Sequence, residues 1–159
     1  MTDKTERLLH PKNWINPETG RRYMYFSKDG HGYDDTLTWA KHFEDRKNKI
    51  IKQENTCFGL FWVSTVWLGL DHSLSPTQPP LVFESMVFSR LKRSYNDFDS
   101  NKYTTEKQAL AGHTELVRKW NNPFFVFWYY NNKYKLAKYG REHFSKIAKG
   151  WIKGRKRKV

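Results

Sequence analysis

The stretch from Leu60 to Leu70, which reads LFWVSTVWLGL, constrains the fold of this chain more than any other. Nearly every position in it is apolar, so both alternating sets of side chains are apolar if the stretch is extended. A strand that is apolar on both faces has to be covered on each side, which is typical of a central strand. We therefore expect a sheet that is built outward from this segment.

Two neighbouring segments are expected to pair with the central strand. Lys49 to Glu54 (KIIKQE) precedes it, and the short stretch from Asn55 to Gly59 allows a hairpin between the two. Leu81 to Phe88 (LVFESMVF) is a third strong strand, and it follows a loop over residues 71–80 that contains three prolines. The simplest arrangement of these segments is an antiparallel meander.

Helix signals lie on both sides of these strands. Asp34 or Asp35 can cap a short helix over residues 36–45. The pattern Thr105-x-x-Gln108 is a capping box, and it opens a longer helix that runs to about Trp120. The expected fold class is therefore α+β, with an antiparallel β-sheet of three to five strands, one main packed helix and a helical, basic C-terminal extension.

Three segments give weaker signals. Residues 1–20 are polar and contain two prolines and a glycine, which predicts an irregular arm. Residues 21–27 (RRYMYFS) are a candidate for a short strand because they are rich in Tyr and Phe. Residues 90–101 mix acidic and basic side chains, and we expect them to form a loop.

Charge divides the chain unequally. Residues 1–116 hold 16 basic and 15 acidic residues, whereas residues 117–159 hold 13 basic residues and a single acidic one. This asymmetry suggests a polyanionic partner, with nucleic acid as the leading class. The alternative is a solvated tail that keeps an aromatic-rich protein soluble. We expect an α+β core domain over residues 1–120 and an aromatic, basic extension over residues 121–159 that packs on it.

The extension interleaves aromatic and basic side chains. The run from Phe124 to Tyr130 is either a strand or the start of a helix, and Phe124, Phe125 and Phe127 are expected in the core. Beyond it, Tyr rings can stack on bases while Lys and Arg contact phosphates, as in single-strand or RNA binding. The predicted nucleic-acid-binding residues are Lys133, Tyr134, Lys135, Lys138, Arg141, Lys146, Lys149, Lys153, Arg155, Lys156, Arg157 and Lys158.

Other features exclude or disfavour whole classes of protein. The single cysteine, Cys57, excludes an intramolecular disulfide framework. No apolar run approaches the roughly 18 residues of a membrane span, so neither an integral membrane protein nor a membrane partner is expected. The first residues carry both signs of charge and lack the apolar core of a secretion signal, which favours the cytoplasm. A glycine-rich phosphate loop and a G-x-S-x-G elbow are also missing, which disfavours an enzyme.

Four polar residues stand out in apolar surroundings: Asp71 and His72 after the central strand, Glu84 in the third strand, and His113 on the apolar side of the long helix. If the fold brings them together, all four are candidate catalytic residues, and His72, Glu84 and His113 are candidate metal ligands. The alternative is structural, with Asp71 capping the loop, Glu84 in a salt bridge and His113 hydrogen-bonded in the core. We expect no cofactor unless this cluster holds a divalent metal.

Several strings of the chain resemble one protein family. They are T-W-A-x-x-F-E-D at 38–45, V-S-T-V-W-L-G-L-D-H-S at 63–73, P-L-V-F-E-S-M-V-F at 80–88, and Y-x-T leading to A-x-x-G-H at 103–113. Over about residues 34–117 they resemble a family of small, mostly uncharacterised proteins of tailed bacteriophages and prophages. The resemblance implies a phage origin and the host bacterial cytoplasm as the setting, but no particular activity. Residues within the shared pattern are Glu44, Asp71, His72, Glu84, Gly112 and His113.

Three functions follow as hypotheses. The leading one is a phage accessory protein that binds nucleic acid, a ribonucleoprotein or a host protein complex through its basic extension, and so interferes with host defence or gene expression. The second is a nucleotide-like small-molecule site, a metal site or a hydrolase at Asp71, His72, Glu84 and His113. The third is a virion or assembly protein whose aromatic run forms a subunit interface.

Overall fold

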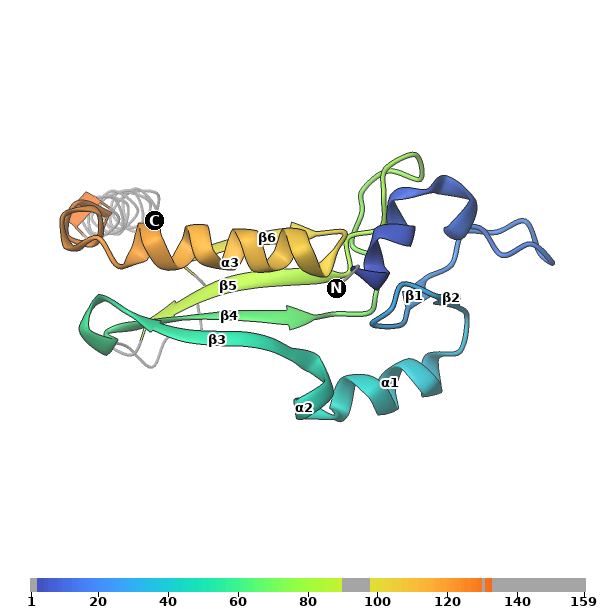
Figure 1. Ribbon diagram of the computed structural model, residues 1–159, viewed down its shortest axis with the longest axis horizontal. Coiled ribbons are helices and arrows are strands. Elements are labelled where there is room, and N and C mark those ends of the chain that lie inside the picture. The colour runs from blue at the N-terminus through green and yellow to red at the C-terminus, as the bar shows by residue number, and fades with distance from the viewer. Residues whose placement is uncertain (1–2, 90–97, 130, 133–159) are drawn as a thin grey trace, which may run out of the picture. The chain divides into compact units, whose positions relative to one another are not determined.

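In the computed structural model, the apolar segment that dominates the sequence forms strand β4 (Phe61–Trp67) in the interior of an antiparallel sheet (Figure 1). Its neighbours are β3 (Ile50–Thr56) and β5 (Phe83–Ser89), and β6 (Asp99–Tyr103) pairs with the far side of β5. Together with a helix packed on the sheet, this arrangement confirms the predicted α+β class and the central place of the apolar strand.

The structure describes residues 3–89, 98–129 and 131–132. The chain divides into two compact units, Met1–Asn121 and Asn122–Val159. In the second unit residues 123–129 are helical, which answers the open question of whether the aromatic run is a strand or a helix. Within the described ranges, no helix has the length and apolar character that a membrane crossing requires.

The register of the sheet decides which side chains share a face. Thr65 of β4 lies opposite Ser85 of β5, and Val66 lies opposite Glu84. Successive side chains of a strand point to opposite faces, so Ser85 and Glu84 belong to different faces of the sheet. Helix α3 (Glu106–Trp120) covers the face of Thr65 and Ser85, because Thr65 Oγ1 lies 2.7 Å from Nδ1 of His113 in that helix.

Helix α3 begins at the predicted capping box of Thr105, but its first turn has further partners from the start of the chain. Thr5 Oγ1 accepts a hydrogen bond from the backbone N–H of Glu106 at 2.8 Å. Asp3 Oδ2 accepts one from the backbone N–H of Lys107 at 2.9 Å. These bonds satisfy amides at the helix N-terminus that have no partner within the helix itself.

The prediction of an arm or irregular lead-in over residues 1–20 is wrong for its first part, because Thr5, Leu8 and Trp14 are buried in the core, whereas residues 15–20 are mostly exposed. Lys4–Leu9 forms a short 3-10 helix, η1, in which Leu8 is fully buried. The Nε1 of the buried Trp14 donates a hydrogen bond to the Leu8 carbonyl oxygen at 2.6 Å. Isolated apolar residues in a polar segment have no periodicity, so the sequence pattern did not reveal their burial.

The covered face of the sheet has two apolar groups with polar residues between them. One group consists of Leu8, Phe26, Trp67, Val82, Phe83 and Ala109. At the other end of α3, the ring of Trp120 lies 5.0 Å from the ring of Phe61. Between these groups the strands place Thr65 and Ser85, and α3 places His113 over them.

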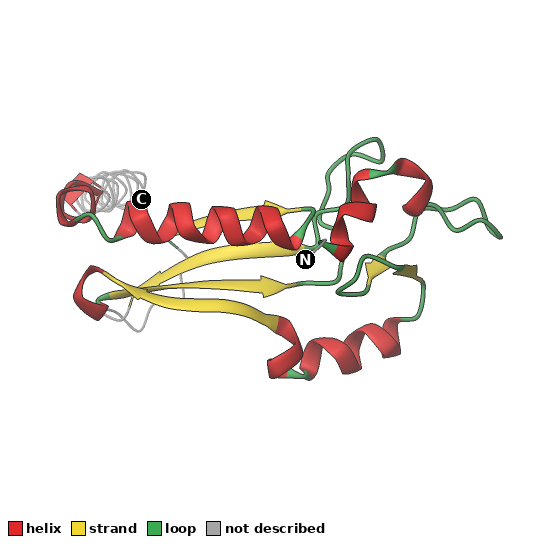
Figure 2. Ribbon diagram, in the orientation of Figure 1, coloured by secondary structure: helices red, strands yellow, loops and turns green. Residues whose placement is uncertain are grey.

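Smaller elements gather at the end of the sheet where β4 ends (Figure 2). Strand β1 (Tyr25–Phe26) pairs with β2 (Gly32–Tyr33), and they are followed by α1 (Thr36–Glu44) and α2 (Arg46–Lys49). Asp35, one of the two residues predicted to cap this helix, is the N-cap of α1. Its side chain accepts hydrogen bonds from the first backbone amides of the helix.

Strand β6 begins in the segment 90–101, for which the sequence predicts a loop, so this prediction is wrong for residues 99–101. The strand reads DSNKY and has no buried residue, which is compatible with its place at the edge of the sheet. An edge strand needs little apolar surface, so it lacks the alternating pattern by which strands are recognised.

Candidate functional site

The structure does not gather the four predicted residues into one site. Glu84 points to the sheet face opposite α3, where its Oε1 lies 2.9 Å from Nζ of Lys102 on β6. His113 lies on the other face, beneath α3. The sheet therefore separates these two candidate metal ligands, and the expected cluster does not form. Among the described residues, no group of three or more His, Cys, Asp or Glu side chains could hold a metal ion.

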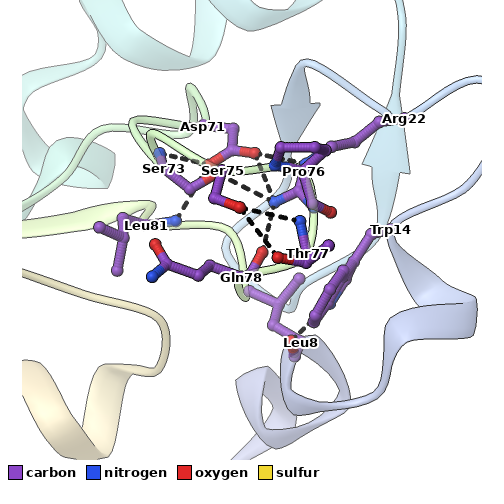
Figure 3. A network of polar contacts seen from close by, with 10 residues as sticks. All are labelled: Leu8, Trp14, Arg22, Asp71, Ser73, Ser75, Pro76, Thr77, Gln78 and Leu81. Atoms are coloured by element: carbon purple, nitrogen blue, oxygen red, sulfur yellow. Dashed lines mark hydrogen bonds and ion pairs between the residues drawn. The ribbon is translucent and has the colours of Figure 1, made fainter.

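Asp71 organises the proline-containing loop, which is the structural alternative for this residue (Figure 3). Its Oδ1 accepts hydrogen bonds from the backbone N–H groups of Ser73 and Leu81, at 2.8 and 3.1 Å. Its Oδ2 accepts one from Nε of Arg22 at 2.8 Å. The neighbouring His72 is exposed and takes no part in this network beyond the backbone.

Arg22 connects the same carboxylate to the rest of the loop. Its guanidinium donates to the carbonyl oxygens of Pro76 and Gln78, at 2.7 and 2.9 Å, and lies 4.9 Å from the centre of the Trp14 ring. The polar atoms of Asp71 and Arg22 are thus largely used in hydrogen bonds within the loop. The pair fixes the loop between β4 and β5, and it has little capacity left for a ligand.

His113 is the end of a buried chain of hydrogen bonds. Ser85 Oγ lies 2.7 Å from Thr65 Oγ1, which lies 2.7 Å from His113 Nδ1, and Nε2 lies 3.7 Å from Oε2 of Glu54. Hydroxyl, imidazole and carboxylate in this order resemble a nucleophilic triad. However, both hydroxyls and the imidazole are buried under α3, so a substrate has no access to them. These bonds satisfy both hydroxyls and Nδ1 of His113 within the core, whereas the buried Nε2 has only the Glu54 carboxylate nearby, beyond hydrogen-bond distance.

Burial lowers the pKa of His113, nearby Lys52 lowers it further, and Glu54 opposes both. The imidazole is therefore held in its neutral form over a wider range of pH than a free histidine. Burial also raises the pKa of Tyr103, whose hydroxyl occupies the space under Gly112. A Cβ at Gly112 would lie only 1.9 Å from that hydroxyl oxygen, which explains a glycine inside this helix.

The first unit contains a cleft that no sequence pattern signalled. It has a volume of about 1310 Å³ and lies between η1, the turn from β1 to β2, helices α1 and α2, and the start of α3. Nζ of Lys107 lies 3.6 Å from Oε1 of Glu6 in its wall. Trp67 also lines it, and the Nε1 of this buried ring has no hydrogen-bond partner among the described residues. The lining comes from segments far apart in the chain, so sequence spacing could not have revealed it.

Asp3 also lines the cleft, but its carboxylate is already used by the protein. Partial burial acts to raise the pKa of Asp3, but the hydrogen bonds from Thr5 and from the backbone N–H of Lys107 outweigh it and lower the pKa. The carboxylate thus accepts hydrogen bonds at the N-terminal ends of both η1 and α3.

The predicted nucleic-acid-binding residues, Lys133 to Lys158, lie outside the described residues. The aromatic run before them is described, and the expectation that Phe124 and Phe127 are core residues is wrong. Phe124 is 85% exposed, Phe127 is 72% exposed and Trp128 is 61% exposed. Apolar character alone suggested burial, but a short helix cannot bury all of its sides unless other elements surround it.

No protein family model, no curated protein and no solved structure matches this chain. Function therefore has to be argued from its own residues.

Proposed function

We propose that this protein binds nucleic acid through its C-terminal unit. The observation that carries the proposal is the distribution of charge. Residues 122–159 hold 11 basic residues and one acidic residue, whereas residues 1–121 hold 18 basic and 15 acidic residues. A net charge of +10 on 38 residues attracts a polyanion, and each phosphate that a Lys or Arg neutralises releases counterions.

Solubility alone does not account for this charge. A net charge of magnitude about 2–8 is enough to keep a small domain in solution, and the charge would not have to be concentrated in one unit. The exposed aromatic side chains of the same unit add surfaces that can stack on bases. The resemblance to tailed-phage proteins supports a nucleic acid or ribonucleoprotein of the bacterial host as the natural target.

The test is fluorescence anisotropy of the full-length protein with labelled single-stranded DNA, RNA and duplex DNA at 50 and 200 mM salt. Binding is expected to be tight at the lower salt and to weaken steeply at the higher one. In a variant with five basic residues of the second unit replaced by Gln, the slope of log affinity against log salt should fall by up to about 3.5 on a single strand and about 4.5 on duplex DNA. These five residues are Lys153, Arg155, Lys156, Arg157 and Lys158.

The matched control replaces five exposed basic residues of the first unit, so that the change in net charge is the same. These residues are Lys12, Arg21, Lys41, Arg46 and Lys47. The control variant should bind almost as the unmodified protein does. If both variants lose affinity equally, binding depends on net charge alone and not on the C-terminal unit. Absence of binding at 50 mM salt would refute the proposal.

A further inference from the structure

The described part of the second unit presents three large aromatic side chains on one side of a helix. Phe124, Phe127 and Trp128 follow the spacing i, i+3 and i+4, which places them on a single face. All three are mostly exposed. A contiguous group of exposed rings is unusual on a soluble surface and commonly marks a binding site.

The start of this helix is well defined. Pro123 occupies its first position, and Asn122 Oδ1 accepts hydrogen bonds from the backbone N–H groups of Phe124 and Phe125, at 3.0 and 3.3 Å. The half-buried ring of Phe125 lies 6.3 Å from that of Trp128. The exposed rings therefore project from a capped helix, with Phe125 supporting one of them.

We infer that Phe124, Phe127 and Trp128 form a stacking surface for the unpaired bases of a single-stranded nucleic acid. The inference rests on the proposed function and makes it more specific. A suitable occupant has to be anionic, to match the net charge of +10 on this unit, and it has to offer flat apolar surfaces to the rings. A single strand has both properties, because its phosphates are charged and its bases are free to stack.

Two other occupants fit these features less well. A duplex pairs and stacks its bases internally, so it offers phosphates but no base faces. An anionic membrane favours a helix with a long apolar face. Here the next position of the same stripe is Asn131, which is exposed, and Asn132 Nδ2 donates a hydrogen bond to the Trp128 carbonyl oxygen at 2.9 Å. Among the described residues of this helix, the aromatic surface thus ends after about two turns.

The experiment measures binding of full-length protein to labelled dT20, rU20 and a 20-base-pair duplex. The variants are Phe124→Ala, Phe127→Ala and Trp128→Ala. Phe58→Ala is the matched control, because Phe58 is an equally exposed ring, 93% accessible, at the tip of the β3–β4 hairpin in the first unit. Circular dichroism and the melting temperature show whether each variant retains its fold.

Each substitution in the aromatic face should weaken dT20 and rU20 binding roughly ten-fold and change duplex binding less than two-fold. The slope against salt should stay the same, because an aromatic ring releases no counterions. Trp128→Phe should retain most of the affinity, since a ring remains for stacking, and Phe58→Ala should behave as the unmodified protein does.

Four results would overturn the inference. Losses of less than two-fold on every probe, or equal losses on single strands and duplex, would refute base stacking while the proposed function stands. Absence of binding to all three probes at 50 mM salt would refute the proposed function, and base stacking with it. If the protein instead binds phosphatidylglycerol vesicles and Trp128→Ala abolishes that binding, the aromatic face belongs to a membrane anchor.

Discussion

The two units of this chain use aromatic side chains in opposite ways. In the first unit, Phe61 and Trp67 of the sheet and Trp120 of α3 are fully buried, in a unit with 18 basic and 15 acidic residues. In the second unit, Phe124 and Phe127 are largely exposed, and almost every charged residue is basic. Aromatic content therefore does not by itself indicate a core. The elements around a ring, and the charge that accompanies it, decide whether the ring stabilises a fold or recognises a partner.

The largest effect that this comparison predicts is a difference in stability between two ring deletions. Trp120→Ala should lower the free energy of unfolding by about 3–5 kcal/mol, because it leaves a cavity under α3 and removes the hydrogen bond from Nε1 to Asp99. Phe127→Ala should change it by less than about 0.5 kcal/mol. Urea denaturation measures both, and similar losses would contradict the contrast between the units.

The next effect concerns the loop network of the first unit. Asp71→Ala should lower the free energy of unfolding by about 2–3 kcal/mol, because it leaves the guanidinium of Arg22 and two backbone N–H groups without their acceptor. The exposed neighbour His72 is the control, and His72→Ala should be nearly neutral. Nucleic-acid affinity should be unchanged in both variants. If the Asp71→Ala variant instead keeps its stability but loses binding of a ligand, Asp71 has a binding role.

A smaller loss is expected from Gly112→Ala. The added methyl group would overlap with the hydroxyl of Tyr103, and relieving that overlap should cost about 1–2 kcal/mol after the better helix propensity of alanine is included. Combining it with Tyr103→Phe should recover part of the loss. Thermal denaturation of the two single variants and the double variant measures the coupling, and strict additivity would show that the two residues do not compete for space.

The smallest effect is a pH dependence that resides in the first unit. Because burial lowers the pKa of His113, the unfolded chain binds a proton at a higher pH than the native protein does. The free energy of unfolding should therefore fall as the pH drops below about 6.5, by at most about 1.4 kcal/mol per pH unit. The His113→Gln variant should lose less of its stability between pH 7 and pH 5 than the unmodified protein does. If the free energy of unfolding depends on pH identically in the two proteins, His113 is not the group responsible.

The sequence predicted those parts of the fold that have a strong periodic or capping signal. The central strand, the capping box at Thr105 and the Asp35 cap all fall where short-range chemistry places them. The edge strand β6 and the packing of Leu8 could not be predicted in this way, because a polar edge and an isolated buried residue produce no period.

The prediction of a four-residue site was wrong for a different reason. Glu84 and Ser85 are adjacent in sequence, yet only Ser85 faces His113, and the choice between them depends on the register of β5 against the helix that covers it. Such a choice is made by tertiary packing. The same limit applies to Phe124, because an apolar run gives the composition of a surface but does not show whether anything covers it.

The caps on α3 also affect the order in which the chain can fold. Asp3 and Thr5 bond to helix amides that are 104 and 101 residues further along the chain. During synthesis, these N-terminal residues leave the ribosome long before their partners do, and they have to wait for nearly the whole unit to emerge.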